Sequence, residues 1–423
     1  MSPLANPVRD RTISAVRRQA LVCATAGSVI LAAPLALAQI DVPGQDWDGS
    51  LTISASTTID LAQAITGDWN VQPTDAAWQP GDGVFDATQW AIVYHYTDVT
   101  IGAGATLDFA NHPSGAPVVW LVTGNVTITG TVNIAGEAGT SSGFSSLPGP
   151  GGFRGGNGTF LGVPRGAGFG PGGGAAGLSQ DGSYATAGGG GAPTYGGSRI
   201  VPLIGGSGGA GNSSSAGAGG GAILVACAGD IQVTGTINAR GGARGDNGAG
   251  SGSGGAIRLI ADGVTVNGTL VATGGFQTAG EGRIRVESTG VLGGTGSIFP
   301  APSLVLLASG ATAQIWPEAT DPSLRIVSLN GLAVPDDPRA TFAFPWQDEA
   351  LDGANGAITV RLEGTNVPSD ATVNVFVTRT GGDHIGPLPA AFVSSGGNVT
   401  TWEIALTDVE NGLSAIQARA VLP

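Results

Sequence analysis

A motif of three short apolar strands recurs five times between Ala91 and Phe299, and no other sequence feature constrains the fold as much. The clearest copy is AIRLIADGVTVNGTLVATGG, from Ala256 to Gly275. Apolar residues alternate with other residues within its strands, which indicates half-buried β-strands rather than helices. A short repeat of this kind cannot bury its own apolar face, so the pattern predicts a solenoid.

Aligning the copies places similar residues in columns. One column starts the third strand of each copy and contains Thr106, Thr131, Thr236, Thr269 and Ser297. Another runs through the second strand and contains Val99, Val126, Ile231, Val264 and Val291. A parallel β-helix requires such columns, because each coil pairs only with the coils above and below it. We therefore expect an all-β fold with a right-handed parallel β-helix over residues 91–301, since parallel crossovers are nearly always right-handed.

The first 38 residues are predicted to be a secretory signal peptide. Four arginines precede an apolar stretch from Ala20 to Leu35, and Ala36-Leu37-Ala38 forms a cleavage site of the A-x-A type. Cleavage after Ala38 would place the mature chain outside the cytoplasm, either released or held at the cell surface by a mode of anchoring that the sequence leaves open.

The charge of the mature chain limits its partners. Removing residues 1–38 takes away four arginines and one aspartate, which leaves 13 arginines, 30 acidic residues and a net charge of −17. This charge argues against nucleic acid or an anionic membrane as partner, and no later stretch is apolar enough to span a bilayer. Extracellular polysaccharide or other cell-surface components are the expected partners, and the oligomeric state is left open.

Two regions flank or interrupt the repeat. Residues 39–90 are rich in aspartate and tryptophan and are predicted to cap the open end of the β-helix, with an aromatic platform for sugars as the alternative. Residues 137–221 contain 32 glycines in 85 residues and form an insertion between the second and third coils. It is either mobile or packed as extended strands around Phe153, Phe160, Tyr184 and Tyr195, with Ile200 to Ile204 docked on the β-helix.

The last hundred residues have a different pattern. From about Pro302 the repeat fades, and residues 322–423 contain short alternating strands separated by turns such as Asn330-Gly331 and Asn411-Gly412. This spacing predicts an immunoglobulin-like β-sandwich without its disulfide. Cys227 is the only cysteine after cleavage of the signal peptide, and its alternation with apolar residues predicts a buried, unreactive thiol.

No residue pattern predicts catalysis, a cofactor or a metal. His95, His112 and His384 are far apart in sequence and are interpreted as structural histidines. Gly206 to Gly211 matches G-x-G-x-x-G, but nothing helical follows it, so nucleotide binding is not expected.

Two polar columns leave alternatives open. Asp98, Asn125 and Asp230 align at a turn, where they would satisfy their own turns or hold a calcium ion. Arg258 and Arg285 align on consecutive coils with Arg283 nearby. They would either form a solvated face balanced by Asp262 and Glu287 or grip a carboxylated glycan.

The chain resembles a group of uncharacterised, secreted glycine-rich bacterial proteins. The strings that carry the resemblance are HPSGAPVVWLVTGNVTITGTV (His112 to Val132), PGGFRGG (Pro150 to Gly156), YGGSRIVPLIGGSGG (Tyr195 to Gly209), GGAIRLIA (Gly254 to Ala261) and GRIRVE (Gly282 to Glu287). The resemblance implies a surface or extracellular protein and supplies no catalytic residues. The coils are also similar in kind to pectin-lyase-like helices and adhesin passengers, but the chain contains no lysine and its acidic residues are scattered.

These observations favour a non-catalytic extracellular or cell-surface protein of structural or adhesion type that presents glycine-rich loops on a β-helix. The alternative is a carbohydrate-binding or polysaccharide-lyase-like β-helix that uses the aromatic region or the arginine column. Ice binding would need a flat face with two threonine columns. It is disfavoured because Thr129 and Thr131 become Asn267 and Thr269 two coils later.

Overall fold

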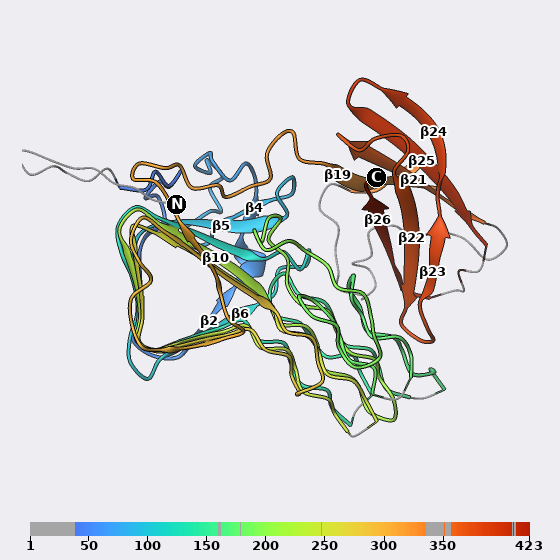
Figure 1. The fold of residues 1–423 in the computed structure, drawn as a ribbon, viewed down its shortest axis with the longest axis horizontal. Helices are drawn as coiled ribbons and strands as arrows, with labels where there is room; N and C mark the ends of the chain where they lie inside the picture. The colour runs from blue at the N-terminus through green and yellow to red at the C-terminus, as the bar shows by residue number, and fades with distance from the viewer. Residues whose placement is uncertain are drawn as a thin grey trace, which may run out of the picture. The chain divides into compact units, whose positions relative to one another are not determined.

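Three rows of parallel strands stack along one axis and enclose an interior that is triangular when viewed end-on (Figure 1). This computed structural model describes residues 39–423 except 142, 160, 161, 178, 247, 336–350, 352–356, 408, 410 and 411, so the predicted signal peptide and Phe160 lie outside the described residues. The first row contains β5 (Ala91–Ile101), β7 (Val118–Val122), β10 (Ala222–Cys227), β13 (Ala256–Ala261), β16 (Arg283–Ser288) and β18 (Ser303–Leu306). The second contains β1 (Gly49–Ile53), the end of β5, β8 (Val126–Ile128), β11 (Asp230–Val233) and β14 (Gly263–Val266). The third contains β2 (Thr57–Asp60), β6 (Thr106–Ala110), β9 (Thr131–Asn133), β12 (Thr236–Asn238), β15 (Thr269–Val271) and β17 (Ser297–Phe299).

The strand register agrees with the predicted columns. The threonine column is continuous, because Thr106, Thr131, Thr236, Thr269 and Ser297 pair in succession. The valine column is confirmed from Val99 to Val264. Its last predicted member is wrong, because Val291 is 88% exposed and belongs to no strand. The predicted β-helix architecture is confirmed.

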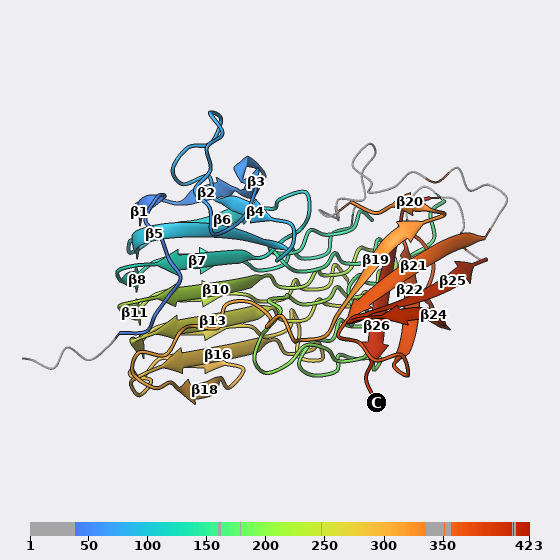
Figure 2. The ribbon, with the colours of Figure 1, turned by 90° about the horizontal axis from the view of Figure 1, so that it is seen from above.

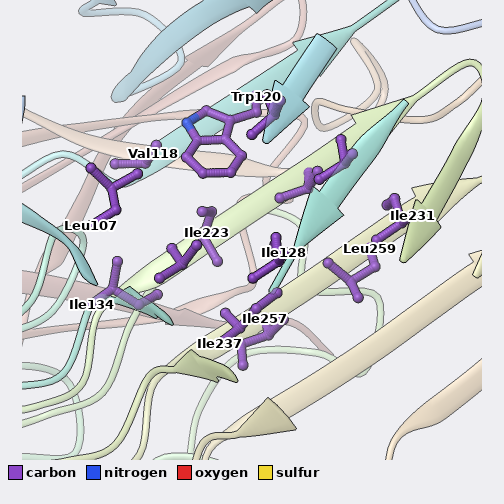
Figure 3. Packing of buried hydrophobic residues seen from close by; sticks show 14 of the residues in the cluster. Leu107, Val118, Trp120, Ile128, Ile134, Ile223, Ile231, Ile237, Ile257 and Leu259 are labelled. Atoms are coloured by element: carbon purple, nitrogen blue, oxygen red, sulfur yellow. The ribbon is translucent and has the colours of Figure 1, made fainter. Parts of the chain in front are cut away.

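The interior of the coil is filled by stacked apolar side chains (Figure 3). Trp120, Val225, Leu259 and Val286 occupy equivalent positions on successive first-row strands, and all four are buried. Because every coil contributes to the same positions, each one covers the apolar surface of its neighbours, which a single coil could not do.

The outward face of the first row is also buried. Val119, Leu224 and Ile260 point away from the interior and pack in a second apolar cluster, against covering residues from distant parts of the chain: Ile40, Ile200, Leu203 and Ile315. The strands of a parallel sheet that is covered on both faces have continuously apolar sequences. The strands β7 (VVWLV) and β10 (AILVAC) have such sequences. The predicted docking of the segment from Ile200 to Ile204 on the β-helix is confirmed.

The residues before Ala91 close one end of the interior. The 3-10 turn η1 (Leu61–Gln63) and β4 (Val84–Asp86) place the fully buried Leu61 and Phe85 in the interior cluster. β4 pairs with β5 in antiparallel fashion and with β3 (Ile65–Thr66) in parallel. The interior is therefore closed at this end, although β1 and β2 each keep an unpaired edge among the described strands.

The C-terminal strands form two antiparallel sheets, which confirms the predicted β-sandwich. One sheet has the order β20 (Leu332–Ala333), β19 (Ser323–Leu329), β21 (Ile358–Thr365), β25 (Val399–Leu406) and β24 (Ala391–Gly396). The other has the order β23 (Ile385–Pro389), β22 (Thr372–Arg379) and β26 (Ser414–Val421). Val360, Leu362, Val373, Val375 and Trp402 are buried between them.

Candidate functional site

Glycine-rich segments follow the third-row strands β9, β12 and β15 and leave the coil at one corner (Figures 1 and 2). In residues 217–222, successive backbone N–H groups donate to three neighbouring segments in turn. The donor–acceptor pairs are Gly217–Gly250, Ala218–Glu137, Gly219–Phe153, Gly220–Ser253, Gly221–Ile134 and Ala222–Pro150. The same neighbour recurs every third residue, which is the period of a polyproline II-type helix without internal hydrogen bonds. We call the packed segments, within 134–158, 166–191, 205–221, 239–255 and 272–282, the glycine bundle.

The bundle requires glycine because its backbones lie in contact. A Cβ atom on Gly219 would fall on the carbonyl group of Gly206, and one on Gly242 would fall on that of Glu137. Both clashes are with backbone, which cannot rotate away as a side chain can. The high glycine content therefore allows the backbones to pack closely. Of the two predicted alternatives, a mobile loop and packed strands, the structure shows packed strands.

Buried polar side chains connect the segments of the bundle. The Asp181 carboxylate accepts hydrogen bonds from the backbone N–H of Ser251 (2.7 Å) and the hydroxyl of Thr278 (2.6 Å), and it is only 3% exposed. The Ser207 hydroxyl donates to the Tyr195 hydroxyl (2.9 Å), which itself donates to the Gly205 carbonyl (2.6 Å). These contacts join segments far apart in sequence and hold the bundle in one arrangement.

The turns at the far ends of the segments contact one another and form one surface. The Asn212 side chain accepts a hydrogen bond from Arg165 (3.0 Å), and its backbone carbonyl accepts one from Thr159 (3.2 Å). The Ser213 hydroxyl donates to the Asp246 carboxylate (2.5 Å), which lowers the pKa of that carboxyl. We call Phe144, Thr159, Arg165, Ser213 and Asp246 the tip surface; Phe144 belongs to it because the N–H of Gly158 donates to Gly143.

Apolar side chains are exposed at or near these turns. Phe144 is 64% exposed and Val163 is 42% exposed. Phe276 is 42% exposed, and the Arg244 guanidinium lies 4.1 Å from the centre of its ring. Sequence reasoning did not single out these residues. The only signal was that polar and aromatic residues interrupt the glycine tracts at the turns.

His95 is a fully buried structural histidine that holds the N-terminal cap. The backbone N–H of Gln45 donates to His95 Nδ1 (3.0 Å), so Nε2 carries the proton and donates to the Trp69 carbonyl (2.7 Å). The ring of Trp47 packs against it, with centroids 4.1 Å apart. Burial lowers the pKa of His95 to about 4, because a charged ring would lose its hydration in this position.

We expect the stability of the protein to fall as the pH drops from about 6.5 to 4, because the unfolded chain protonates His95 in this range and the folded chain does not. The loss attributable to His95 is about 3 kcal/mol. Urea unfolding at several pH values should show it, and His95→Gln should remove this part of the pH dependence. Burial raises the pKa of Asp48, whose carboxylate accepts a hydrogen bond from the backbone N–H of His95. Asp48 therefore adds stability as the pH falls, and it does so in both the unchanged protein and the His95→Gln variant. Identical pH profiles for the two proteins would contradict this assignment.

The other two histidines also have structural partners. His112 Nδ1 lies 2.8 Å from the Ser114 hydroxyl, and its ring packs on Phe85. His384 Nδ1 lies 2.9 Å from the Thr378 hydroxyl, and its Nε2 lies 3.2 Å from the Gly173 carbonyl. His95 and His112 each bind their own neighbours, so no paired-histidine site is formed.

The Asp98, Asn125 and Asp230 column binds backbone, but not in the predicted way. Asp98 Oδ1 accepts from the N–H of Asn125 (2.8 Å), and Asn125 Oδ1 accepts from the N–H of Asp230 (2.9 Å). Asp98 and Asn125 thus each satisfy the turn of the next coil and not their own turn. Within the described residues, no group of three histidine, cysteine or acidic side chains is placed to hold a metal ion.

The two arginines of the column, Arg258 and Arg285, both bind the carboxylate of Glu287. Arg258 and Arg285 stack in register, as predicted. Glu287 Oε1 lies 2.7 Å from both Nε and NH2 of Arg258 and 2.8 Å from Nε of Arg285. The side chain of Arg258 is 1% exposed, so the predicted solvated face and glycan grip are both wrong for this residue. The predicted balance of the two arginines by Glu287 is confirmed. Arg283 donates to the carbonyls of Tyr195 and Gly196.

The tryptophans of the N-terminal region pack inward. Trp120 is fully buried in the core, Trp69 stacks on the ring of His95, and Trp90 donates to the Ser114 carbonyl (3.0 Å). These contacts favour the cap interpretation over a row of exposed rings. Cys227 is buried as predicted, and burial raises the pKa of its thiol to about 12, which keeps it unreactive.

Within the part of the chain that the structure describes, no helical segment has the length and hydrophobicity that a membrane span requires. Comparison of the chain with family models, curated proteins and solved structures gives no match.

Proposed function

We propose that this is a non-catalytic extracellular or cell-surface protein of adhesion type, in which the β-helix carries the glycine bundle and the tip surface contacts extracellular polysaccharide or another surface component. The observation that carries the proposal is the hydrogen-bond network of the bundle. It holds a set of exposed side chains at a fixed distance from the coil. Rigid presentation lowers the entropic cost of binding, because the contact residues are already ordered.

The distribution of titratable groups supports a non-catalytic role. Groups with strongly shifted pKa values mark catalytic sites when they line a cleft. Here His95 is enclosed by the cap, while Tyr94 and Cys227 are packed in the interior of the coil. Their pKa shifts come from burial in structural positions. The tip surface has one cation, Arg165, and one anion, Asp246, beside Phe144, a combination suited to contact rather than to proton transfer.

Binding to a polysaccharide array should test the proposal. We expect the mature chain to bind at least one extracellular polysaccharide, and Phe144→Ala with Arg165→Ala to weaken binding at least about tenfold, because exposed aromatic and arginine side chains dominate contact energies. Phe392→Ala is the matched control, since Phe392 is 51% exposed in the β-sandwich. It should bind as the unchanged protein does.

Two results would overturn the proposal. Equal binding by the double variant and the unchanged protein would exclude the tip surface. Release of unsaturated uronates from an acidic polysaccharide would show that the protein is a lyase. This result would support the alternative function, a polysaccharide-lyase-like β-helix.

A further inference from the structure

The C-terminal end of the β-helix lies open. Among the described strands, β17 pairs only with β15, and β18 only with β16; Figure 2 shows β18 as the last strand of its row. Leu304 and Leu306 lie below Val286 and Ser288, whose side chains point into the interior. Val286 and Ser288 are 2% and 3% exposed, whereas Leu304 and Leu306 are 57% and 70% exposed. The interior columns therefore continue to a face that no described residue covers.

The last stretch of the coil adds no charge to this end, and the charged side chains that contact it, Arg285 and Asp262, belong to the preceding coils. Val291 and Phe299 add further exposed apolar surface, at 88% and 55%. From Ser288 to Pro317 the chain contains no aspartate, glutamate, arginine, lysine or histidine. Strand edges that stay unpaired are usually protected by charged residues, prolines or bulges; Pro300 and Pro302 lie between β17 and β18 and not within either strand. The edge strands are short, with three residues in β17 and four in β18, but they contain neither a charged residue nor a proline that would block pairing.

We propose that this end surface, formed by Leu304, Leu306 and the unpaired edges of β17 and β18, binds the same surface of a second copy of the chain. The occupant must supply strands spaced like β17 and β18 and an apolar interior between them, and the end of another copy supplies both. The charge argument favours a second copy as well. Two mature chains of net charge −17 repel each other, and they can approach most closely where the last stretch of the coil adds no charge.

The symmetry follows from the opposite end of the solenoid. Leu61 and Phe85 fill the interior at the N-terminal end, and β4 covers part of β5 there. Among the described strands, β1 and β2 keep one unpaired edge each, but the interior between them is already filled. A head-to-tail contact would therefore leave the apolar interior at the C-terminal end without a matching open interior to cover it. The contact is therefore isologous, with the two C-terminal ends facing each other about a two-fold axis, and it closes as a dimer without growing into a fibre.

Sedimentation equilibrium of the mature chain tests this inference, independently of the tip surface. We expect twice the mass of one mature chain at micromolar concentration. Leu304→Glu with Leu306→Glu places four negative charges in the dimer interface and should raise the dissociation constant at least about a hundredfold. Val71→Glu is the control, because Val71 is 58% exposed on the N-terminal cap. It should leave the dimer intact.

Hydrogen exchange separates loss of the interface from loss of the fold. In the double variant the amides of β18 should exchange faster, while those of β10 and β13 stay protected. A monomeric unchanged protein would overturn the proposal, and protected β18 amides in that monomer would assign the end surface to a segment of the same chain. Dimerisation of the double variant with unchanged affinity would overturn it equally.

Discussion

Replacing Glu287 with glutamine is expected to lower the free energy of unfolding by about 3–5 kcal/mol, because it leaves a buried positive charge without its counter-ion. The guanidinium of Arg258 contacts Glu287 through two nitrogens at 2.7 Å, and its side chain is 1% exposed. Its third nitrogen, NH1, is buried without a hydrogen-bond partner. Glutamine has the size of glutamate, so the loss reports charge rather than a cavity.

The matched control is Glu403→Gln in the β-sandwich. Glu403 pairs with Arg361 at 3.0 Å, but the two side chains are 39% and 40% exposed. Water screens such a pair, and its loss should cost less than about 1 kcal/mol. Urea unfolding followed by circular dichroism measures both variants. If the two substitutions cost the same, the buried pair contributes no more than a surface pair and the electrostatic account of this face is wrong.

Replacing Gly219 with alanine is expected to cost about 3 kcal/mol or more, because the added methyl group meets the backbone of Gly206. The segment from 217 to 222 lies among at least three hydrogen-bonded neighbours. A shift that relieved the clash would therefore lengthen several hydrogen bonds at once. The loss should appear as a lower midpoint of thermal unfolding.

Gly197→Ala is the control within the same insertion. The nearest heavy atom to its added Cβ is 4.0 Å away, and Gly197 does not have a left-handed φ. Because alanine restricts the unfolded chain more than glycine does, this change should be neutral or stabilise the protein by up to about 1 kcal/mol. Equal effects of the two substitutions would indicate that the bundle is loosely packed and that its glycines are not required.

Much of the coil could be predicted from sequence because its pattern is local. The threonine column from Thr106 to Ser297 and the valine column as far as Val264 follow from aligning copies of one motif, and the register agrees with both. The prediction failed at Val291, where the alignment continued a column that the chain leaves. The last coil has no neighbour beyond it, so nothing requires the pattern to persist there.

The candidate site was less predictable. The sequence showed a glycine-rich insertion between the second and third coils and the docking of Ile200 to Ile204. It left open whether the rest of the insertion is mobile or packed, because glycine has no side chain and gives no periodic pattern that identifies its neighbours. The tip surface brings Arg165, Ser213 and Asp246 together from three turns. No spacing along the chain indicates that these turns meet.

The sequence by itself determined the parallel coil, its strand register and the C-terminal β-strands, because alternation along a strand reports directly which side chains face a core. Only the tertiary structure decided which outward positions are covered. Arg258 lies in an outward position that reads as solvated, yet Ile200 and Ile315, far from it in sequence, belong to the apolar layer on that face of the sheet. Burial depends on which distant segments return to the coil. Which segments return is decided by the packing of the whole chain, and no local sequence pattern indicates it.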